Sequence, residues 1–243
     1  MKAVILAAGA GKRLGNEQGP KPLTKLLNGK TILELQLERL APYFSVHDTL
    51  IVVGYQKEKV LEAFPEALFV YNSRFAEENT AKSLWRAFRK IEEDVLWMNG
   101  DVVFRPSVLQ KVLACQATCM AVNIATVGGE EVKYRTHAGK FITQVSKEVE
   151  DPEGEAVGIN FMTKKDLPLF RENLARCPDK EYFEKAIQWC IDAGMQVAPV
   201  KIAADECVEV DFPGDLEKAN QLITSWAQEE RLAAGWIKEG KLT

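Results

Sequence analysis

A short apolar run near the start of the sequence leads directly into a loop of small and basic residues. The run covers residues 2–7, and the loop at residues 8–15 contains glycine at positions 9, 11 and 15. An apolar run bounded by glycines is typical of a buried strand in a parallel sheet. Because glycine has no Cβ atom, backbone N–H groups in such a loop approach an anion closely. Lys12, Arg13 and Lys21 add three cations to the same stretch, so it predicts a binding site for a polyphosphate.

The sequence of this loop excludes one common nucleotide-binding motif and matches a second only in part. A P-loop requires Gly-x4-Gly-Lys-Ser/Thr, whereas Lys12 is followed by Arg13 and position 6 is leucine. The dinucleotide fingerprint requires Gly-x-Gly-x-x-Gly, and Leu14 occupies the place of its third glycine. An NAD-linked dehydrogenase therefore stays only as a remote alternative.

Apolar runs alternate with amphipathic stretches along the chain, which predicts a doubly wound parallel sheet. The expected strands are residues 2–7, 49–53, 68–71, 95–98, 120–127, 197–202 and 208–211. The expected helices are residues 31–40, 56–63, 80–91, 106–115, 164–174, 182–193 and 215–232. Between about 129 and 163, shorter strands at 132–134, 141–145 and 157–162 are separated by Gly, Asp and Pro turns. We expect the α/β class: a single Rossmann-like three-layer α/β/α domain over residues 1–243, mostly parallel, with a small antiparallel insertion beside its cleft.

Composition and net charge indicate which classes of binding partner to expect. The 243 residues are 47% hydrophobic, enough for a sizeable core, and the net charge of −4 argues against nucleic acid or an anionic membrane as a partner. No apolar run approaches the roughly 18 residues of a membrane span, and because Met1 and Lys2 lead straight into a strand we expect no secretory leader. The five cysteines (115, 119, 177, 190 and 207) are expected as core residues in a reducing cytoplasm, with metal ligation by Cys115, Cys119 and His137 as the lesser alternative.

Two aspartates fall at the ends of predicted strands. Asp101 follows the run at 95–98, and Asp211 follows the run at 207–210. Ligands of open α/β sheets bind beyond the carboxyl ends of the strands, and paired carboxylates facing a triphosphate suit a hard cation such as Mg²⁺. A lone aspartate after a strand is more often a cap or turn residue, and that interpretation stays open here on the residues alone.

The loop resembles a known family. Leu-Ala-Ala-Gly-x-Gly-x-Arg-Leu at residues 6–14 and Pro-Lys-Pro-Leu at 20–23 are similar to the opening of nucleotidyltransferases that activate sugar phosphates and alcohol phosphates. The resemblance implies catalytic roles for Arg13, Lys21 and Lys12 at the nucleotide phosphates, and a Mg²⁺ ion on Asp101 and Asp211. The nucleotide-binding residues it implies are Leu6, Ala7, Ala8, Gly9, Ala10, Gly11, Lys12, Arg13, Lys21, Asn79, Thr80, Ser83, Gly100 and Asp101.

Three further segments resemble bacterial cytidylyltransferases that act on phosphocholine and related small phosphates or phosphonates. They are residues 79–85, 144–147 and 154–159. The first implies that Asn79, Thr80 and Ser83 lie over the pyrimidine. The others imply that Lys147 lies near the acceptor phosphate and that Glu155 reaches the polar end of the acceptor, with Tyr182 as a further acceptor-binding residue. The insertion at about 129–163 would then form part of the acceptor side.

The resemblance implies Mg²⁺-dependent transfer from CTP to a small phosphorylated or phosphonate acceptor, giving a CDP-linked product and pyrophosphate. A phosphocholine-like acceptor and a role in making precursors of cell-surface polysaccharide fit this expectation. The alternatives are a sugar-1-phosphate nucleotidyltransferase that uses UTP or GTP, and a non-catalytic nucleotide-binding domain. No nucleic acid or membrane partner is expected, and a homo-oligomer stays open.

Overall fold

A computed structural model describes residues 1–15, 19–124 and 127–239. Within that part of the chain, the main path of the central sheet has the strand order β10, β6, β9, β4, β1, β2, β3. These strands are β1 (Lys2–Ala7), β2 (Thr49–Val53), β3 (Leu68–Tyr71), β4 (Val95–Asn99), β6 (Cys119–Asn123), β9 (Gly154–Met162) and β10 (Ala198–Lys201). Strand β1 is parallel to both of its neighbours, β2 and β4, as the apolar runs predict.

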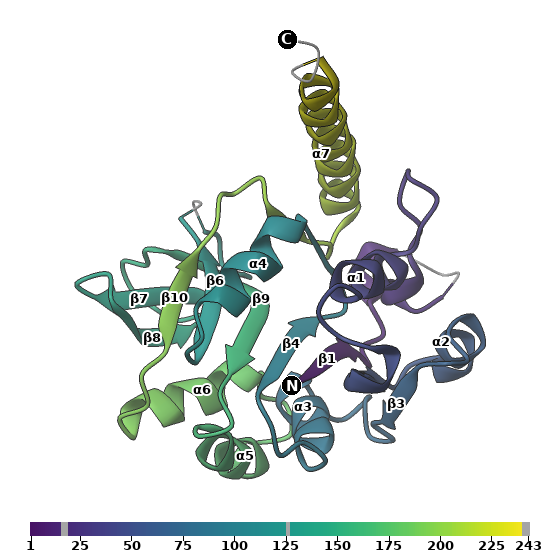
Figure 1. Cartoon of the computed structure of the whole chain (residues 1–243). Coiled ribbons are helices and arrows are strands. Elements are labelled where there is room, and N and C mark those ends of the chain that lie inside the picture. Colours follow the sequence, from purple (N-terminus) through teal and green to yellow (C-terminus); the bar gives the residue numbers. More distant parts are fainter. Residues whose placement is uncertain (16–18, 125–126, 240–243) are drawn as a thin grey trace.

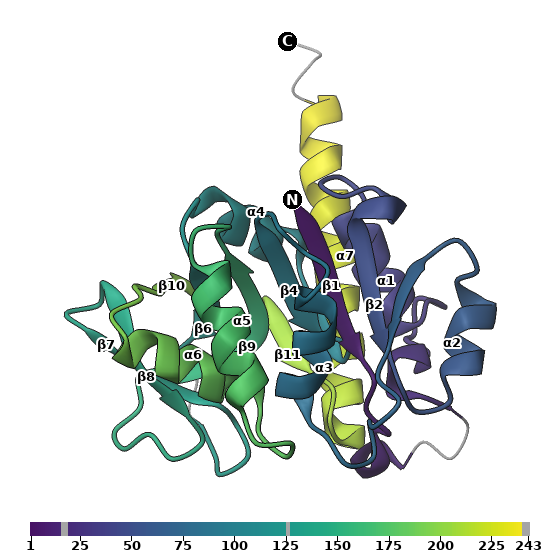
Figure 2. The same cartoon turned by 90° about the horizontal axis from the view of Figure 1, so that it is seen from below.

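Helices cover both faces of this sheet, which confirms the three-layer α/β/α arrangement (Figure 1). One face carries α1 (Ile32–Leu40), α2 (Lys57–Ala63) and α4 (Pro106–Ala114), and the other carries α3 (Thr80–Phe88), α5 (Leu167–Arg176) and α6 (Phe183–Asp192). Figure 2 shows the second group lying in front of the strands. Short 3-10 turns occupy Lys12–Leu14, Lys21–Leu23 and Val46–Asp48.

Local chemistry sets the helix ends. The Oγ1 atom of Thr31 accepts a hydrogen bond from the backbone N–H of Glu34, and the Glu34 carboxylate accepts one from the backbone N–H of Thr31. This reciprocal capping box satisfies two of the free N–H groups at the start of α1. Helix α3 begins in a similar way, because Oδ1 of Asn79 accepts from the backbone N–H of Thr80.

The antiparallel part of the fold differs from the prediction. Strands β7 (Lys133–His137) and β8 (Phe141–Ser146) form the expected hairpin, and only the first residues of β9 pair with β7. Strand β9 lies between β4 and β6 and pairs antiparallel with both, so the segment treated as the end of an insertion is a central strand of the sheet. The apolar run of residues 157–162 indicated a buried strand, but burial alone does not identify its neighbours.

The expected return of residues 208–211 to the main sheet is also wrong. Strand β11 (Cys207–Glu209) pairs antiparallel with β5 (Val102–Phe104), a strand that the sequence pattern missed, in a separate two-stranded sheet. The pairing continues as the backbone N–H of Val210 donates to the carbonyl of Asp101 at 2.9 Å. The residue after Val210 is therefore brought to the end of β4 by a ribbon outside the main sheet.

Helix α7 (Pro213–Glu239) is longer than predicted and projects from the body of the molecule (Figures 1 and 2). Its first half is held by a small core in which Ala219, Ile223 and Trp226 pack with Leu26 and Ile32. No helix in the described ranges has the length and apolar character needed to cross a membrane.

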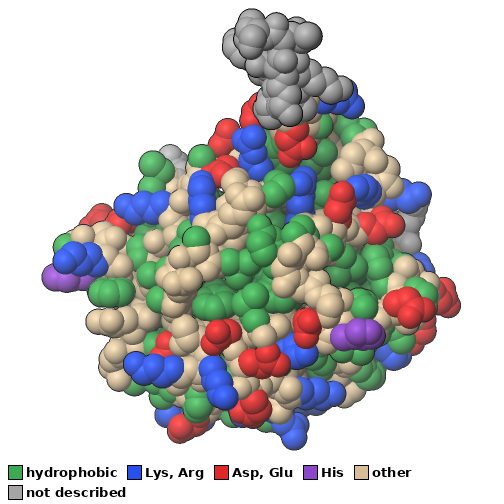
Figure 3. Space-filling model, viewed as in Figure 1, with side chains coloured by type: hydrophobic (Ala, Val, Ile, Leu, Met, Phe, Trp, Pro, Cys, Tyr) green, Lys and Arg blue, Asp and Glu red, His purple; other side chains and the backbone are tan. Residues whose placement is uncertain are grey.

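The cysteines lie mostly in the interior. Cys119, Cys177, Cys190 and Cys207 are buried as free thiols, and Cys115 is half-buried. The two histidines of the chain lie well apart at the surface (Figure 3), and within residues 1–15, 19–124 and 127–239 no group of three or more His, Cys, Asp or Glu side chains has the arrangement of a metal site.

Candidate active site

A cavity of about 320 Å³ opens at the carboxyl ends of β1 and β4. Its floor is closed where the backbone N–H of Gly100 donates to the carbonyl of Leu6 at 2.9 Å. A Cβ atom at position 100 would lie 2.6 Å from that carbonyl oxygen, so only glycine lets the two strand ends approach this closely. The predicted site residues that line the cavity are Leu6, Ala7, Gly9, Gly11, Arg13, Lys21, Asn79, Thr80, Gly100, Asp101, Lys147, Tyr182 and Asp211.

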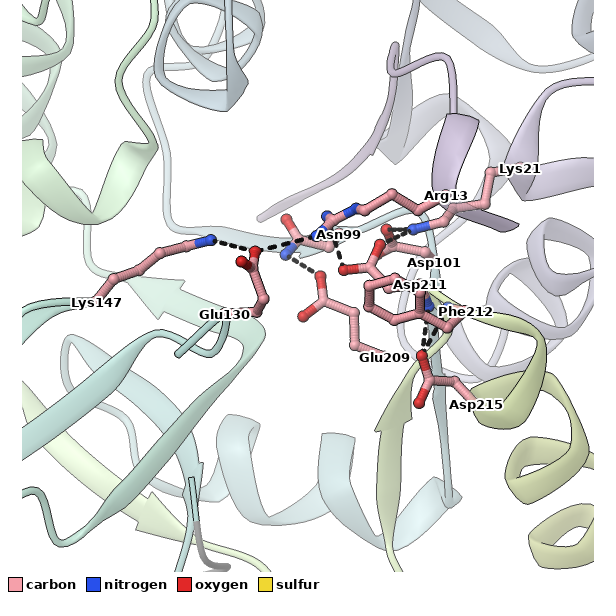
Figure 4. A network of polar contacts seen from close by, with 10 residues as sticks. All are labelled: Arg13, Lys21, Asn99, Asp101, Glu130, Lys147, Glu209, Asp211, Phe212 and Asp215. Carbon is pink, nitrogen blue, oxygen red and sulfur yellow. Dashed lines mark hydrogen bonds and ion pairs between the residues drawn. The ribbon is translucent and has the colours of Figure 1, made fainter. Parts of the chain in front are cut away.

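Lys21 joins the two predicted metal-binding carboxylates. Its Nζ atom lies 2.6 Å from Oδ2 of Asp101 and also donates to Oδ1 of Asp211 (Figure 4). The lysine is buried, which acts to lower its pKa, but the two carboxylates outweigh burial and raise the pKa above its usual value. Lys21 is therefore a fixed positive charge at neutral pH.

Arg13 lies on the other side of Asp211. Its guanidinium is 2.9 Å from Oδ2 of Asp211, 3.2 Å from the Glu130 carboxylate and 5.4 Å above the Phe212 ring (Figure 4). Asp215 fixes the backbone of Asp211 and Phe212 just before α7, because its Oδ2 atom accepts hydrogen bonds from both of their backbone N–H groups. The arginine thus faces the open cleft with its plane already oriented.

Gly11 places Lys21 beside the loop. Its φ of +58° lies in the left-handed region, and a Cβ atom there would lie 2.7 Å from Cβ of Lys21. A side chain at position 11 would strain the backbone and displace the lysine at once. The glycine at position 11 therefore leaves room for Lys21, a requirement separate from the predicted close approach of the loop to an anion.

The opposite wall of the cavity carries Lys147 and the start of α6. The Lys147 ammonium is 3.4 Å from Glu130 and 4.9 Å above the ring of Tyr182. Glu184 lines the same wall, and burial raises its pKa to about 7. Tyr182 and Lys147, predicted from different segments, are thus in contact.

Glu209 forms another part of the wall and accepts a hydrogen bond from Nδ2 of Asn99 at 3.2 Å. The side chain of Glu209 is open to the cleft. Desolvation by the protein groups around it, followed by the negative charges of Asp101 and Asp211, raises the pKa of Glu209 well above its usual value.

Asn79 and Thr80 line the seam between α3 and α6. The Nδ2 group of Asn79 donates to the carbonyl of Lys180, and Oγ1 of Thr80 accepts from the backbone N–H of Phe183. Ser83 lies deeper, buried behind the wall, where its hydroxyl accepts from Nδ2 of Asn72.

The remaining predicted residues do not line the cavity. Glu155 accepts a hydrogen bond from Nδ2 of Asn123 at 2.6 Å, Ala8 is buried, and Ala10 is half-buried in the loop. The side chain of Lys12 lies outside the described part of the structure.

Comparison with known proteins identifies the fold that carries this cavity. Residues 3–177 match the model of the MobA-like NTP transferase domain. The chain belongs to this family. Over 96% of its length it is 29% identical to the CMP-5'-(3-aminopropyl)phosphonate synthase of Streptomyces rubellomurinus, of which it spans 40%.

Solved structures share the fold of this NTP transferase domain. The CTP:phosphocholine cytidylyltransferase of Streptococcus pneumoniae superposes with a TM-score of 0.75 at 20% identity, covering 91% of this chain and 98% of that one. The inositol-1-phosphate CTP transferase of T. maritima gives a TM-score of 0.71 at 22% identity, covering 91% and 95%. The homologues are nucleotidyltransferases, and cytidylyltransferases are among them.

The residues of the transferase domain fit a divalent cation. Oδ1 of Asp101 is buried and, within the described residues, has no hydrogen-bond partner, while the Asp211 carboxylate faces the same Lys21 ammonium. Two carboxylates with free oxygen lone pairs are the ligand type that Mg²⁺ takes when phosphate oxygens and water supply the rest of its coordination. Asp101 and Asp211 are thus suited to hold such an ion.

Four polar residues among the described lining residues were not among the predicted site residues. Asn99 and Glu209 had a signal in the sequence, since Asn99 shares the strand end with Gly100, and Glu209 lies two residues before Asp211 on an extended segment. Glu130 and Glu184 had none, because a single glutamate in a loop or in the first turn of a helix is normally a solvated charge.

Proposed function

We propose that the chain transfers a cytidylyl group from CTP to a small phosphate ester or phosphonate and releases pyrophosphate. The observation that carries this proposal is the meeting of Arg13, Lys21, Asp101 and Asp211, from four separate segments, at one wall of the cavity. The family and the printed activities of the relatives support transfer to small acceptors. We also propose that residues 1–243 act as one domain, in the cytoplasm.

In the proposed reaction an acceptor oxygen forms a bond to the α-phosphorus of CTP. The bond from that phosphorus to the oxygen bridging to the β-phosphate breaks, and the electron pair leaves with pyrophosphate. Because a phosphate or phosphonate is already anionic at pH 7, the step needs no strong general base. Catalysis then rests on positioning and charge neutralisation.

The side chains divide these tasks. Arg13 and Lys21 supply fixed positive charge to the triphosphate, and the Gly9–Gly11 backbone approaches it closely. Asp101 and Asp211 would hold Mg²⁺, which would neutralise charge on the phosphates when bound. Lys147 lies across the cavity and would bind the anionic end of the acceptor.

The decisive experiment offers CTP, UTP, GTP and ATP separately with MgCl₂ and a pool of small phosphate esters, phosphonates and sugar 1-phosphates. Pyrophosphate release is followed, and mass spectrometry identifies nucleotide-linked products. We expect CTP alone to support turnover with a small non-sugar acceptor. Turnover with UTP or GTP and a sugar 1-phosphate would replace the proposal with the sugar-nucleotide alternative. Binding of CTP without turnover would indicate a non-catalytic nucleotide-binding domain.

A further inference from the structure

Glu184 is a buried acidic side chain in the wall of the cavity. It lies in the first turn of α6, is only 6% exposed, and lines the same wall as Tyr182. Its Oε2 atom is buried and has no hydrogen-bond partner within the described residues. Removing a carboxylate from water without a partner is costly, so a site that keeps one is suited to a ligand that supplies the partner.

The charges of the described lining side chains point to the sign of that ligand. Five carboxylates face three cations in the cavity. Asp101 and Asp211 are paired with Lys21, and Glu130 is paired with Arg13 and Lys147. Glu209 accepts a hydrogen bond from Asn99, which leaves Glu184 as the carboxylate with no side-chain partner among the described lining residues and with one oxygen that has no partner at all.

The neighbours of Glu184 place it at the acceptor end of the cavity. Lys147 contacts the face of Tyr182, two residues before Glu184, so one stretch of wall offers an ammonium group and a carboxylate close together. A short molecule with an anionic group at one end and a cation at the other would satisfy both. The Tyr182 ring, which lines the same wall, adds an aromatic face.

We propose that Glu184 is the specificity-determining residue of the acceptor pocket and that the acceptor is a short zwitterion carrying a protonated primary amine opposite its phosphate or phosphonate. This inference rests on the proposed function. A primary ammonium donates N–H hydrogen bonds to a buried carboxylate, whereas a trimethylammonium group has none to donate. A neutral alkyl group would leave the carboxylate unpartnered.

The protonation state of Glu184 should also make the acceptor selectivity depend on pH. Burial raises the pKa of Glu184 to about 7, and the positive charge of Lys147, at the end of β8, acts to lower it. Glu209 is a further carboxylate that interacts with Glu184 through its charge. Selectivity for the amine should therefore increase between pH 6 and pH 8 as the carboxyl ionises, since an alkyl ammonium stays charged over this range.

The test compares three acceptors with CTP and MgCl₂: 2-aminoethylphosphonate, ethylphosphonate and phosphocholine. We expect 2-aminoethylphosphonate to exceed ethylphosphonate in kcat/KM by about 100-fold or more at pH 8, because the amine-free analogue leaves a buried polar group unpaired. In Glu184→Gln this ratio should fall below about tenfold, mainly through KM, because the charge partner of the amine is lost. Glu172→Gln, an exposed change on α5, should keep the wild-type ratio.

The outcomes separate this inference from the proposed function. Equal use of 2-aminoethylphosphonate and ethylphosphonate by the wild type would overturn the inference while leaving cytidylyl transfer intact, and so would a preference for phosphocholine. Full selectivity in Glu184→Gln would overturn the role of this residue. Absence of turnover with every acceptor would count against the proposed function itself. If Glu184→Gln does not fold, the acceptor ratio and its pH dependence in the wild type decide.

Discussion

The ammonium group of Lys21 lies 2.6 Å from Oδ2 of Asp101, whereas the other oxygen of that carboxylate is buried without a hydrogen-bond partner in the described part of the chain. The same ammonium group reaches Asp211. One buried cation thus holds together two carboxylates that would otherwise repel each other, and it leaves oxygen lone pairs free at the point where a divalent cation and a triphosphate would meet. The predictions below follow from this arrangement and from its neighbours.

Replacing Lys21 with alanine should reduce turnover by about 100-fold or more, as when one preorganised charge-stabilising group is removed. Pyrophosphate release at saturating CTP measures the effect. Lys25→Ala, an exposed change two residues beyond the short turn of Lys21, serves as the control and should keep wild-type turnover. If the turnover of Lys21→Ala stays within about threefold of the wild-type value, other groups neutralise the charge of the phosphates.

Mg²⁺ should stabilise Lys21→Ala more than it stabilises the wild type. Without the ammonium group, Asp101 and Asp211 repel each other, and a divalent cation relieves that repulsion. The thermal unfolding midpoint, measured first in EDTA and then in about 10 mM MgCl₂, reports this difference without any measurement of activity. An equal shift in both proteins would argue against these carboxylates as metal ligands.

Asp101→Ala should lose nearly all turnover and remain folded. The side chain lies at the end of β4, where it contacts Lys21 but contributes no packing to the apolar core. Pyrophosphate release and circular dichroism measure the two properties. The exposed Asp205→Ala serves as the matched control. A normal rate of product formation by Asp101→Ala would refute the metal assignment.

Two glycines of the first loop allow a matched test of the position of Lys21. Gly11 and Gly15 both have left-handed φ angles, +58° and +68°, but only a Cβ atom at position 11 would collide with Lys21. Either change to alanine should cost about 1 kcal/mol of backbone strain. Gly11→Ala should in addition lower kcat/KM by roughly tenfold or more, because misplacing a charge-stabilising group weakens the transition state. Equal kinetics in the two variants would contradict the importance of the Gly11 contact.

Glu184 should make the stability of the protein depend on pH. Its pKa is about 7 in the folded chain and is raised from 4.5 by burial, so the folded state binds the proton more tightly. The stabilisation is complete below pH 4.5 and is lost as the pH rises through 7, at a cost on the order of 3 kcal/mol.

Urea unfolding at pH 5 and pH 8, without substrates, measures this effect in the wild type and in Glu184→Gln. At pH 8 the variant should be more stable than the wild type by roughly 1 to 3 kcal/mol, because it removes a buried ionised carboxylate that has one oxygen without a hydrogen-bond partner. At pH 5 the two proteins should be nearly equal. A variant that is less stable at both values would indicate that Glu184 stabilises the fold.

The sequence by itself determined the elements whose signals are local. Strands Lys2–Ala7, Thr49–Val53 and Leu68–Tyr71 have the predicted bounds, because each is an apolar run that ends at glycine or polar residues; the first two runs are largely buried, and the third lies at the edge of the sheet. The loop that follows the first strand predicted a polyphosphate site for the same reason. Glycine and lysine at fixed spacing determine which backbone conformations and charges one short segment offers, whatever its neighbours are.

Only the tertiary structure decided which distant segments meet. The apolar run of β9 indicated burial and not its place between β4 and β6, and the antiparallel pairing of β5 with β11 brings Asp211 beside Asp101. Glu130 and Glu184 acquire their positions in the same way. Periodicity records how deeply a residue is buried, whereas strand pairing and electrostatic contacts depend on competition among all segments for partners, which no local pattern contains.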